Sequence, residues 1–217
     1  MSTSWEAFLD YLLRDGAVGF VCGDDFRFGN RGEGDCQKLQ SYCQTRDLPC
    51  VIVPEQLMEG SRISSTRIRR LLEVGDVEQA NGLLGHPHSI TGQVVTGQQL
   101  GRTIGIPTAN LQLPKHILCP RYGVYACRVF VEDMCYLAVT NVGVRPTVAG
   151  DHVTVEPWIL DFNGDLYGKT LTLHFHAFLR PEQKFDSLEA LKAQIQVDAE
   201  KTRCLLQGEK TGFDRKS

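Results

Sequence analysis

Hydrophobic positions in the first 85 residues recur three and four apart, which is the spacing of helices with one buried face. Thr3 and Glu6 form a capping-box pattern before the first such stretch, and Gly16 follows its last apolar residue. We therefore predict a first helix between Thr3 and Gly16. Three more helices are predicted on the same grounds, over residues 35–45, after Ser65 and after Asp76.

Two short apolar runs, residues 17–22 and 50–53, interrupt this helical pattern. Such runs are typical of parallel strands that are covered on both faces. With the helix between them, they predict a strand–helix–strand unit, the building block of a doubly wound sheet. Because two parallel strands alone do not make a stable sheet of this kind, the pattern indicates an incomplete α/β domain over residues 1–85.

From residue 89 onward, the pattern changes to short runs in which apolar and polar residues alternate. Several such strands, separated by turn residues, indicate an antiparallel barrel or sandwich. A helix from Ser187 to about Gln207 is predicted to close this domain. Gly85 and Pro87 end the helical pattern before the strands begin, so we place a domain boundary there. The predicted division is an α/β domain over 1–85, a β domain with its C-terminal helix over 86–208, and a polar tail over 209–217.

The composition narrows the class of protein. The formal net charge is −3, from 23 Lys and Arg against 26 Asp and Glu, and there is no basic stripe and no long apolar run. We therefore expect no nucleic-acid partner and no membrane partner. Cysteines occur without a C-x-x-C pair, in a chain without a signal-peptide pattern. These features predict reduced thiols in a cytoplasmic protein; they do not indicate an oligomeric state.

A glycine-rich segment follows the first predicted strand of the β domain. Gly97, Gly101 and Gly105 recur at four-residue intervals, and Arg102 follows the second of them. Glycine lets the backbone approach a ligand closely, and successive backbone N–H groups can form a concave site for phosphate. The same glycines could instead only shape turns between barrel strands. Their spacing alone does not decide between the two interpretations.

Thr108 and Asn110 follow in the run Pro107-Thr108-Ala109-Asn110. Because they are two residues apart, their side chains point to the same face of an extended segment. Both offer neutral oxygen atoms, which suit a hard cation such as Mg²⁺ or a sugar hydroxyl. We therefore predict a ligand site at this segment.

This run, together with other segments, closely resembles the riboflavin kinase module of the bacterial bifunctional riboflavin kinase/FAD synthetases. The resemblance covers nearly the whole chain. It implies a six-stranded antiparallel β-barrel with a C-terminal helix, preceded by an α/β domain of the nucleotidyltransferase (Rossmann-like) type. The matching segments are residues 21–29, 63–69, 97–110, 123–125, 141–147, 160–162 and 165–168.

For the nucleotide, the resemblance implies a phosphate-side loop and a metal site. Gly97, Gly101 and Arg102 would form the loop, and Thr108 with Asn110 would coordinate Mg²⁺ and the nucleotide. Phosphoryl transfer requires positioning, a metal and neutralisation of charge on the moving group, which these residue types supply. ATP is thus the expected co-substrate and ADP a product.

For the flavin, the resemblance implies that Glu156 is the general base that accepts a proton from the ribityl 5′-hydroxyl of riboflavin. Arg180 and Asn110 would contact the flavin. A lone glutamate in a strand is usually a solvated residue, so the role of Glu156 rests on the matching segment around it. Pro157-Trp158 departs from the Thr/Val-His usual after this glutamate in the family. Proline removes a ladder donor, so we expect a strand edge or a bulge here.

A second candidate site lies at residues 64–69. Ser64, Ser65 and Thr66 precede a predicted helix, with Arg69 behind them, and such a helix start can bind phosphate. The alternative is a plain helix cap with a basic, solvated face. In the resembled family this segment serves the adenylyltransferase. The H-x-G-H loop of that activity is absent from the sequence, so we interpret residues 1–85 as a remnant of the adenylyltransferase domain.

The leading hypothesis is accordingly an ATP:riboflavin 5′-phosphotransferase that makes FMN. FAD synthesis from FMN and ATP is the second hypothesis, and we expect it to be weak or absent. The third hypothesis is a barrel that binds a flavin or a nucleotide without turning it over.

Overall fold

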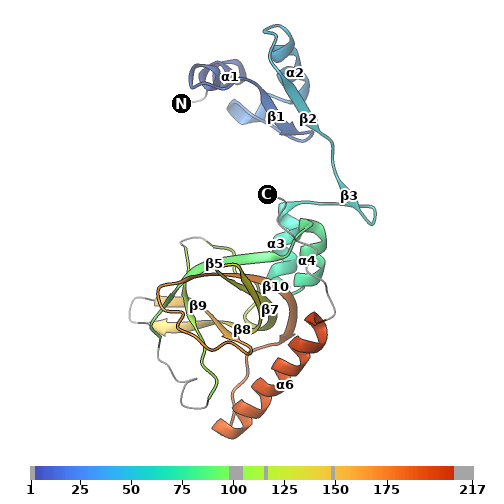
Figure 1. Ribbon diagram of the computed structural model, residues 1–217. Coiled ribbons are helices and arrows are strands. Elements are labelled where there is room, and N and C mark those ends of the chain that lie inside the picture. The colour runs from blue at the N-terminus through green and yellow to red at the C-terminus, as the bar shows by residue number, and fades with distance from the viewer. Residues whose placement is uncertain (1–2, 98–104, 115–116, 148–149, 208–217) are drawn as a thin grey trace. The chain divides into compact units, whose positions relative to one another are not determined.

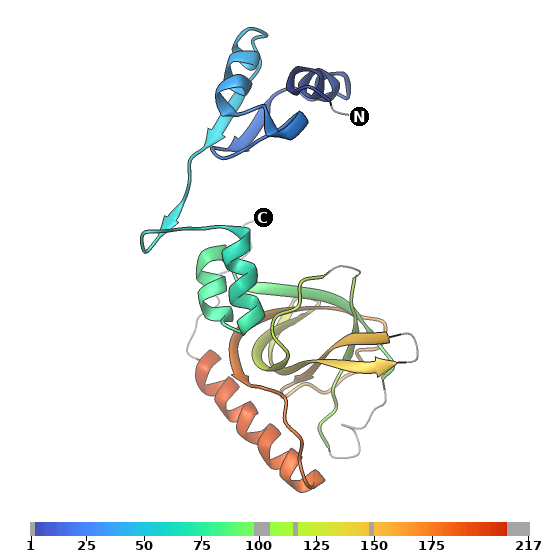
Figure 2. The same cartoon turned by 180° about the vertical axis from the view of Figure 1, so that it is seen from behind.

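The computed structural model describes residues 3–97, 105–114, 117–147 and 150–207. The chain divides into two compact units, residues 1–63 and residues 64–217. Figure 1 labels most elements of both units, and Figure 2 shows the same elements from behind.

The first unit contains a parallel two-stranded sheet, as the sequence predicts. Phe20 pairs with Cys50, and the register runs on to the pair of Gly23 and Val53. The elements of this unit are α1 (Trp5–Arg14), β1 (Phe20–Gly23), the 3₁₀ turn η1 (Asn30–Gly32), α2 (Cys36–Gln44), β2 (Cys50–Val53), β3 (Leu57–Met58) and β4 (Ser61–Arg62). The short antiparallel pair β3–β4 was not predicted, because its four residues carry no alternating pattern.

The core of the first unit is covered on one side only. Leu9 of α1 and Leu39 of α2 are almost fully buried in it. On the strands, alternate residues are exposed, with Val21 at 71% and Val51 at 53%. The prediction that both faces of these strands are covered is therefore wrong for the described residues. The first helix also begins one residue later than predicted, because Ser4 rather than Thr3 caps it by accepting from the amide of Ala7.

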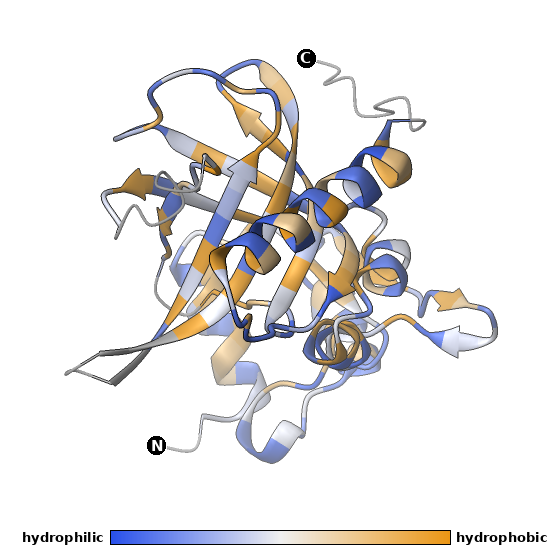
Figure 3. Cartoon of the chain, turned by 90° about the horizontal axis from the view of Figure 1, so that it is seen from below, coloured by the Kyte–Doolittle hydropathy of each residue, from blue (hydrophilic) through white to orange (hydrophobic). Residues whose placement is uncertain are grey.

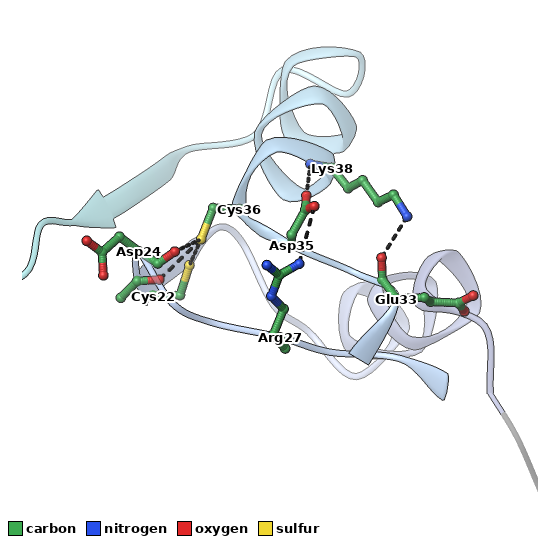
Figure 4. A network of polar contacts seen from close by, with 8 residues as sticks. Cys22, Asp24, Arg27, Glu33, Asp35, Cys36 and Lys38 are labelled. Atoms are coloured by element: carbon green, nitrogen blue, oxygen red, sulfur yellow. Dashed lines mark hydrogen bonds and ion pairs between the residues drawn. The ribbon is translucent and has the colours of Figure 1, made fainter. Parts of the chain in front are cut away.

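A polar network holds the loop between β1 and α2 (Figure 4). Asp35 caps α2 by accepting from the amide of Lys38 at 2.9 Å, and its other oxygen lies 3.5 Å from Arg27 Nη1. At the same end of the helix, the thiol of Cys36 contacts the carbonyl oxygens of Gly23 and Asp24 at 3.2 and 3.3 Å. The segment that includes Asp24 and Arg27 is therefore fixed by contacts within its own unit.

The second unit is a six-stranded antiparallel barrel with helices at its surface. The strand order is β6-β5-β10-β7-β8-β9, which confirms the six-stranded barrel implied by the resemblance. The elements are α3 (Ser65–Val74), α4 (Val77–Leu84), β5 (His88–Val95), β6 (Asn110–Gln112), β7 (Gly123–Val131), β8 (Met134–Thr147), β9 (Gly150–Ile159), β10 (Thr170–Arg180) and α6 (Leu188–Leu206).

Helices α3 and α4 belong to the barrel's unit. Leu72, Val77 and Ala80 are at most 1% exposed and form one core cluster with barrel residues such as Phe175. Asn81 of α4 also donates to the carbonyl oxygen of Phe175 at 2.8 Å. The compact units therefore divide after residue 63, whereas the sequence places the domain boundary after residue 85. As a division between related modules, the boundary at 85 stays a prediction.

The C-terminal helix α6 packs outside the barrel against β7 and β8. Ser187 caps it, as the predicted start requires, by accepting from the amide of Ala190. Ala199 joins a buried cluster with Val124 and Val139 of the two strands. Figure 3 shows α6 lying across the strands, with apolar and polar residues interspersed along it. None of the described helices has the length and apolar character needed to cross a bilayer.

Candidate active site

Two pockets adjoin on the barrel, and Thr108 lines both of them. The first, which we call the loop pocket, has a volume of about 90 Å³ and is lined by Val94, Val95, Gly97, residues 107–110, Pro157, Ile159, Phe162 and residues 164–167. The second, the helix pocket, has about 320 Å³ and is lined by Ile106, Thr108, Val124, Val139, Asn141, Glu156, Trp158, Arg180, Glu182, Gln183, Phe185, Leu191, Ile195 and Asp198. A ligand that passed Thr108 would occupy both.

Gly97 lines the loop pocket at a position where a larger residue would not fit. A Cβ atom at this position would lie 2.3 Å from Asn110 Nδ2, far inside van der Waals contact. The two residues meet because β5 and β6 are paired up to Val95 and Asn110, and Gly97 follows Val95 by two residues. Gly97 therefore leaves room for the Asn110 side chain, and its close approach to a phosphate stays a prediction. Gly101 and Arg102 lie outside the described residues.

The segment that leads into β6 holds Thr108 on the same side as Asn110, the first residue of the strand. Ile106 and Ala109 are buried, whereas Thr108 and Asn110 are half-buried and line the loop pocket. The amide of Ala109 donates to the carbonyl oxygen of Pro157 at 2.9 Å, which joins this segment to β9. Thr108 and Asn110 thus share a face, as predicted, and Thr108 also reaches the pocket that contains Glu156.

Glu156 lies in the helix pocket, on β9 opposite Asn141 of β8. β9 is at the end of the strand order, and this explains how Pro157 is accommodated. Its missing N–H is not needed on an edge strand, and its carbonyl oxygen makes the bond to Ala109. The structure therefore brings Glu156 and Thr108 into one pocket. Asn110 lines the adjoining one.

The helix pocket also contains groups that the sequence alone did not assign. Asn141 donates to Glu182 Oε1 at 3.1 Å, and a Cβ atom at position 143 would lie 2.3 Å from that same oxygen. Gly143 therefore leaves the space that Glu182 fills. The only sequence signal for these residues is that Asn141, Gly143 and Glu182 fall within or beside segments that match the resembled family.

Arg180 lines the helix pocket and makes an ion pair within it. Its Nε donates to Oδ2 of Asp198 at 2.9 Å, and Nη2 lies 2.9 Å from the same oxygen. Asp198 is fully buried, whereas 14% of the Arg180 side chain is exposed. Arg180 thus lines the helix pocket with part of its guanidinium already bonded to α6, and its contact with a flavin stays a prediction.

The predicted site at residues 64–69 lies apart from both pockets. Ser64, not Ser65, caps α3 by accepting from the amide of Arg67 at 3.2 Å. Arg69 lies 3.4 Å from the hydroxyl of Ser65, and Thr66 is exposed. None of Ser64, Ser65, Thr66 and Arg69 lines the loop pocket or the helix pocket.

A further cavity, of about 680 Å³, lies elsewhere on this unit and is lined by Glu73, Cys119 and Arg121 among others. None of the residues predicted from the sequence to form a site lines it. Among the described residues, no group of three or more His, Cys, Asp or Glu side chains is arranged to hold a metal ion.

A six-stranded antiparallel barrel with a C-terminal helix, and with two adjoining pockets that share Thr108, defines a class of small β-barrel proteins. Within this class, the family model for riboflavin kinase matches residues 84–206. The chain belongs to the riboflavin kinase family. The family model for FAD synthetase matches residues 1–67.

Similar proteins agree with this assignment. The chain is 38% identical over 200 residues to a bifunctional riboflavin kinase/FMN adenylyltransferase of Listeria monocytogenes, covering 91% of this chain and 63% of that protein. It is 42% identical over 207 residues to one of Pseudomonas fluorescens, covering 94% and 66%. The chain therefore spans less than two thirds of the length of these relatives.

A solved structure has the same fold. It is a crystal structure from Streptococcus pneumoniae described as a macrolide-efflux protein, with a TM-score of 0.82 and 37% identity, covering 93% of this chain and 66% of that one. Its name describes an activity different from those of the two matched families.

Proposed function

We propose that this chain transfers the γ-phosphoryl group of ATP to the ribityl 5′-hydroxyl of riboflavin, giving FMN and ADP. The observation that carries the proposal is the position of Thr108, which lines both pockets, with Glu156 in the helix pocket and Asn110 in the loop pocket. Membership of the riboflavin kinase family supports the same reaction.

The two pockets suit the two substrates. The helix pocket, at about 320 Å³, is within the range of small-molecule sites, roughly 300–1,000 Å³. Trp158 and Phe185 line it and offer apolar surface to a flat ring system. The loop pocket, with Gly97 at its edge, suits the phosphate side of ATP. The junction at Thr108 is then the place where the 5′-hydroxyl and the γ-phosphate meet.

A divalent cation fits this junction. Thr108 and Asn110 supply neutral oxygen atoms, and Mg²⁺ commonly combines few protein ligands with phosphate oxygens and waters. Mg²⁺ bound there would neutralise charge on the transferred group. Gly97, and in the family's pattern Gly101 and Arg102, would hold the phosphates on the other side.

Glu156 serves as general base in this proposal. It accepts the proton of the 5′-hydroxyl as that oxygen bonds to the γ-phosphorus and the bond from phosphorus to the β,γ-bridging oxygen breaks. Arg180, which also lines the helix pocket, contacts the flavin in this proposal.

Incubation of the chain with riboflavin, ATP and MgCl₂, followed by chromatography of the flavins, tests the proposal. We expect FMN and ADP in equal amounts, and no FMN when ATP or Mg²⁺ is left out. A folded protein that binds riboflavin but forms no FMN would contradict the proposal and favour a barrel that only binds its ligands.

Adenylyl transfer to FMN is the second candidate, because residues 1–67 match the FAD synthetase family. The 217-residue sequence contains no H-x-G-H loop, and such a loop supplies the donors that stabilise charge on the α-phosphate. We therefore expect FMN and no FAD in the same assay. FAD formation would show that other residues of the chain replace that loop.

A further inference from the structure

Asp198 is a buried carboxylate at the edge of the helix pocket. Its side chain is 0% exposed. Arg180 Nε donates to Oδ2 at 2.9 Å, and Gln194 Nε2 donates to Oδ1 at 3.0 Å. Each carboxylate oxygen therefore has a donor, as a buried charge requires.

Stability alone does not account for such a pair. Taking a carboxylate and a guanidinium out of water costs free energy that their attraction often does not exceed, and apolar side chains of similar volume can replace a buried pair without loss. A guanidinium is planar, however, and its donors have fixed directions. A buried acceptor can therefore hold Arg180 in one orientation.

Arg180 in turn connects several parts of the pocket wall. It stands at the end of β10, its Nη1 donates to the carbonyl oxygen of Pro181 at 3.2 Å, and its Cζ lies 5.7 Å from the centre of the Phe185 ring. Arg180 and Phe185 both line the helix pocket. Since a guanidinium has five N–H donors, Arg180 retains donors for a ligand after these bonds are made.

We propose that Asp198 is a positioning residue for flavin binding, which holds Arg180 with its remaining donors toward the carbonyl-bearing edge of the isoalloxazine ring. This inference rests on the proposed function and goes beyond it, because it separates affinity for the flavin from affinity for the nucleotide. Asp198 lines the helix pocket but not the loop pocket. Its loss should therefore weaken riboflavin binding and leave ATP binding unaffected.

Asp198→Asn tests this role. The substitution preserves the size of the side chain and an acceptor for Gln194, and it removes the charge that holds Arg180. We expect the Kd for riboflavin, measured by quenching of flavin fluorescence, and the KM for riboflavin both to rise about tenfold, the effect of losing one hydrogen bond to a charged group. The KM for ATP should not change.

Asp161→Asn is the matched control. Asp161 pairs at 3.1 Å with Arg203, which is on the same helix as Asp198, and neither Asp161 nor Arg203 lines the helix pocket. This variant also converts an aspartate of an Arg–Asp pair to asparagine. It should bind riboflavin as the wild type does, so a raised Kd in it would show that any loosening of α6 weakens binding.

A double variant separates positioning from packing. Arg180→Met combined with Asp198→Leu replaces the pair by apolar side chains, and we expect a wild-type Tm with a Kd for riboflavin raised at least as far as in Asp198→Asn.

A double variant that binds riboflavin normally would overturn the inference, as would an unchanged Kd and KM in Asp198→Asn. If Asp198→Asn does not fold, the Kd of the double variant decides. A wild-type chain that binds riboflavin but forms no FMN would contradict the proposed function only, since the Kd comparison stands without turnover.

Discussion

Three carboxylates line the helix pocket: Asp198 is paired with Arg180, and the surroundings of the other two, Glu156 and Glu182, assign them different tasks. Glu182 is exposed and accepts a hydrogen bond from Asn141 at 3.1 Å. Glu156 lies within β9 beside the segment that holds Thr108. A strand fixes the direction of its side chains more firmly than a loop does, and a general base has to be aimed at its proton. These positions favour Glu156 as the base and Glu182 as a wall residue.

We therefore expect Glu156→Gln to lower kcat by about 100-fold or more, the contribution typical of general base catalysis. The Kd for riboflavin should change little, because an amide fills the same space. Rapid-quench measurement of FMN formation, together with fluorescence titration of riboflavin, checks both expectations. Glu182→Gln is the matched variant. If it, rather than Glu156→Gln, abolished turnover, Glu182 would be the base.

At this scale, the sequence predicted part of the site. Thr108, Asn110 and Glu156 could be singled out because each belongs to a segment that resembles the family, and they line two adjoining pockets, while their roles stay predictions. Asp198 could not be assigned, because its place depends on how α6 packs against the barrel. Asn141 faces Glu156 only through the register of two strands, and register is a property of paired chains that no single segment carries.

At the scale of elements, prediction succeeded where a local signal fixes a boundary. Ser187 and Asp76 cap helices as expected, because a side chain that accepts from the third following amide is a property of a few adjacent residues. By the same reasoning, the sequence does not show which of two adjacent serines caps a helix, and Ser64 caps α3 where Ser65 was expected. The three-residue strand β6 was not predicted as a separate strand. It exists because β5 is there to pair with it.

The β5–β6 pair leads to a prediction at Gly97. Gly97→Ala places a methyl group within 2.3 Å of Asn110 Nδ2, so Asn110 must move away from the loop pocket. We expect the KM for ATP to rise about tenfold or more, because the loss of a contact worth about 1.4 kcal/mol weakens binding tenfold. The Kd for riboflavin should change less. Steady-state kinetics with varied ATP measures this.

Two variants complete that experiment. Gly82→Ala is the matched control, since a Cβ atom there meets nothing within 4 Å, and it should leave the KM for ATP unchanged. Gly97→Ala combined with Asn110→Ala removes the clash. If the double variant regained the wild-type KM, Asn110 would have no part in nucleotide binding. If Gly97→Ala alone had a wild-type KM, the close approach would not matter.

We expect the stability of the barrel to depend on pH through His88 of β5, which bonds to Asn81 of α4. Burial lowers the pKa of His88, whose ring lies 3.1 Å from the carbonyl oxygen of Leu118 and whose amide donates to Asn81. Burial likewise lowers the pKa of His174. A histidine with a lowered pKa in the folded state binds fewer protons there than in the unfolded chain, so the free energy of unfolding falls as the pH drops through the ordinary pKa of about 6.5.

Urea titrations at two pH values, one on each side of the ordinary histidine pKa, measure this effect. We expect the wild type to lose stability at the lower pH and His88→Gln, which keeps a donor for the carbonyl of Leu118, to lose less. The comparison between the two proteins cancels the carboxylates, which titrate in both. An equal loss in both proteins would exclude His88 as a source of the pH dependence.

At the scale of the whole molecule, sequence pattern and compact structure divide the chain at different places. The family model for riboflavin kinase begins at residue 84, close to the predicted boundary at 85, whereas the compact unit of the barrel begins at residue 64. The difference is the helix pair α3–α4. Its helical pattern groups it with the preceding α/β segment, but its apolar face is buried in the barrel core, and a single sequence does not show which core a helical face joins.

Two shortened chains distinguish these boundaries. A chain that starts at Ile63 keeps the cap of α3 and both helices, and we expect it to fold and to form FMN at the rate of the full chain.

A chain that starts at His86 loses Leu72 and Val77, which are at most 1% exposed. Burying a side chain of this size stabilises a fold by about 1.5–3 kcal/mol, which is a large share of the roughly 5–15 kcal/mol of a whole domain. The shorter chain also lacks Asn81, which bonds both His88 and the carbonyl oxygen of Phe175. We expect it to unfold at a markedly lower urea concentration or to aggregate, so equal stability of the two shortened chains would show that α3 and α4 are dispensable to the barrel and that the boundary lies after residue 85.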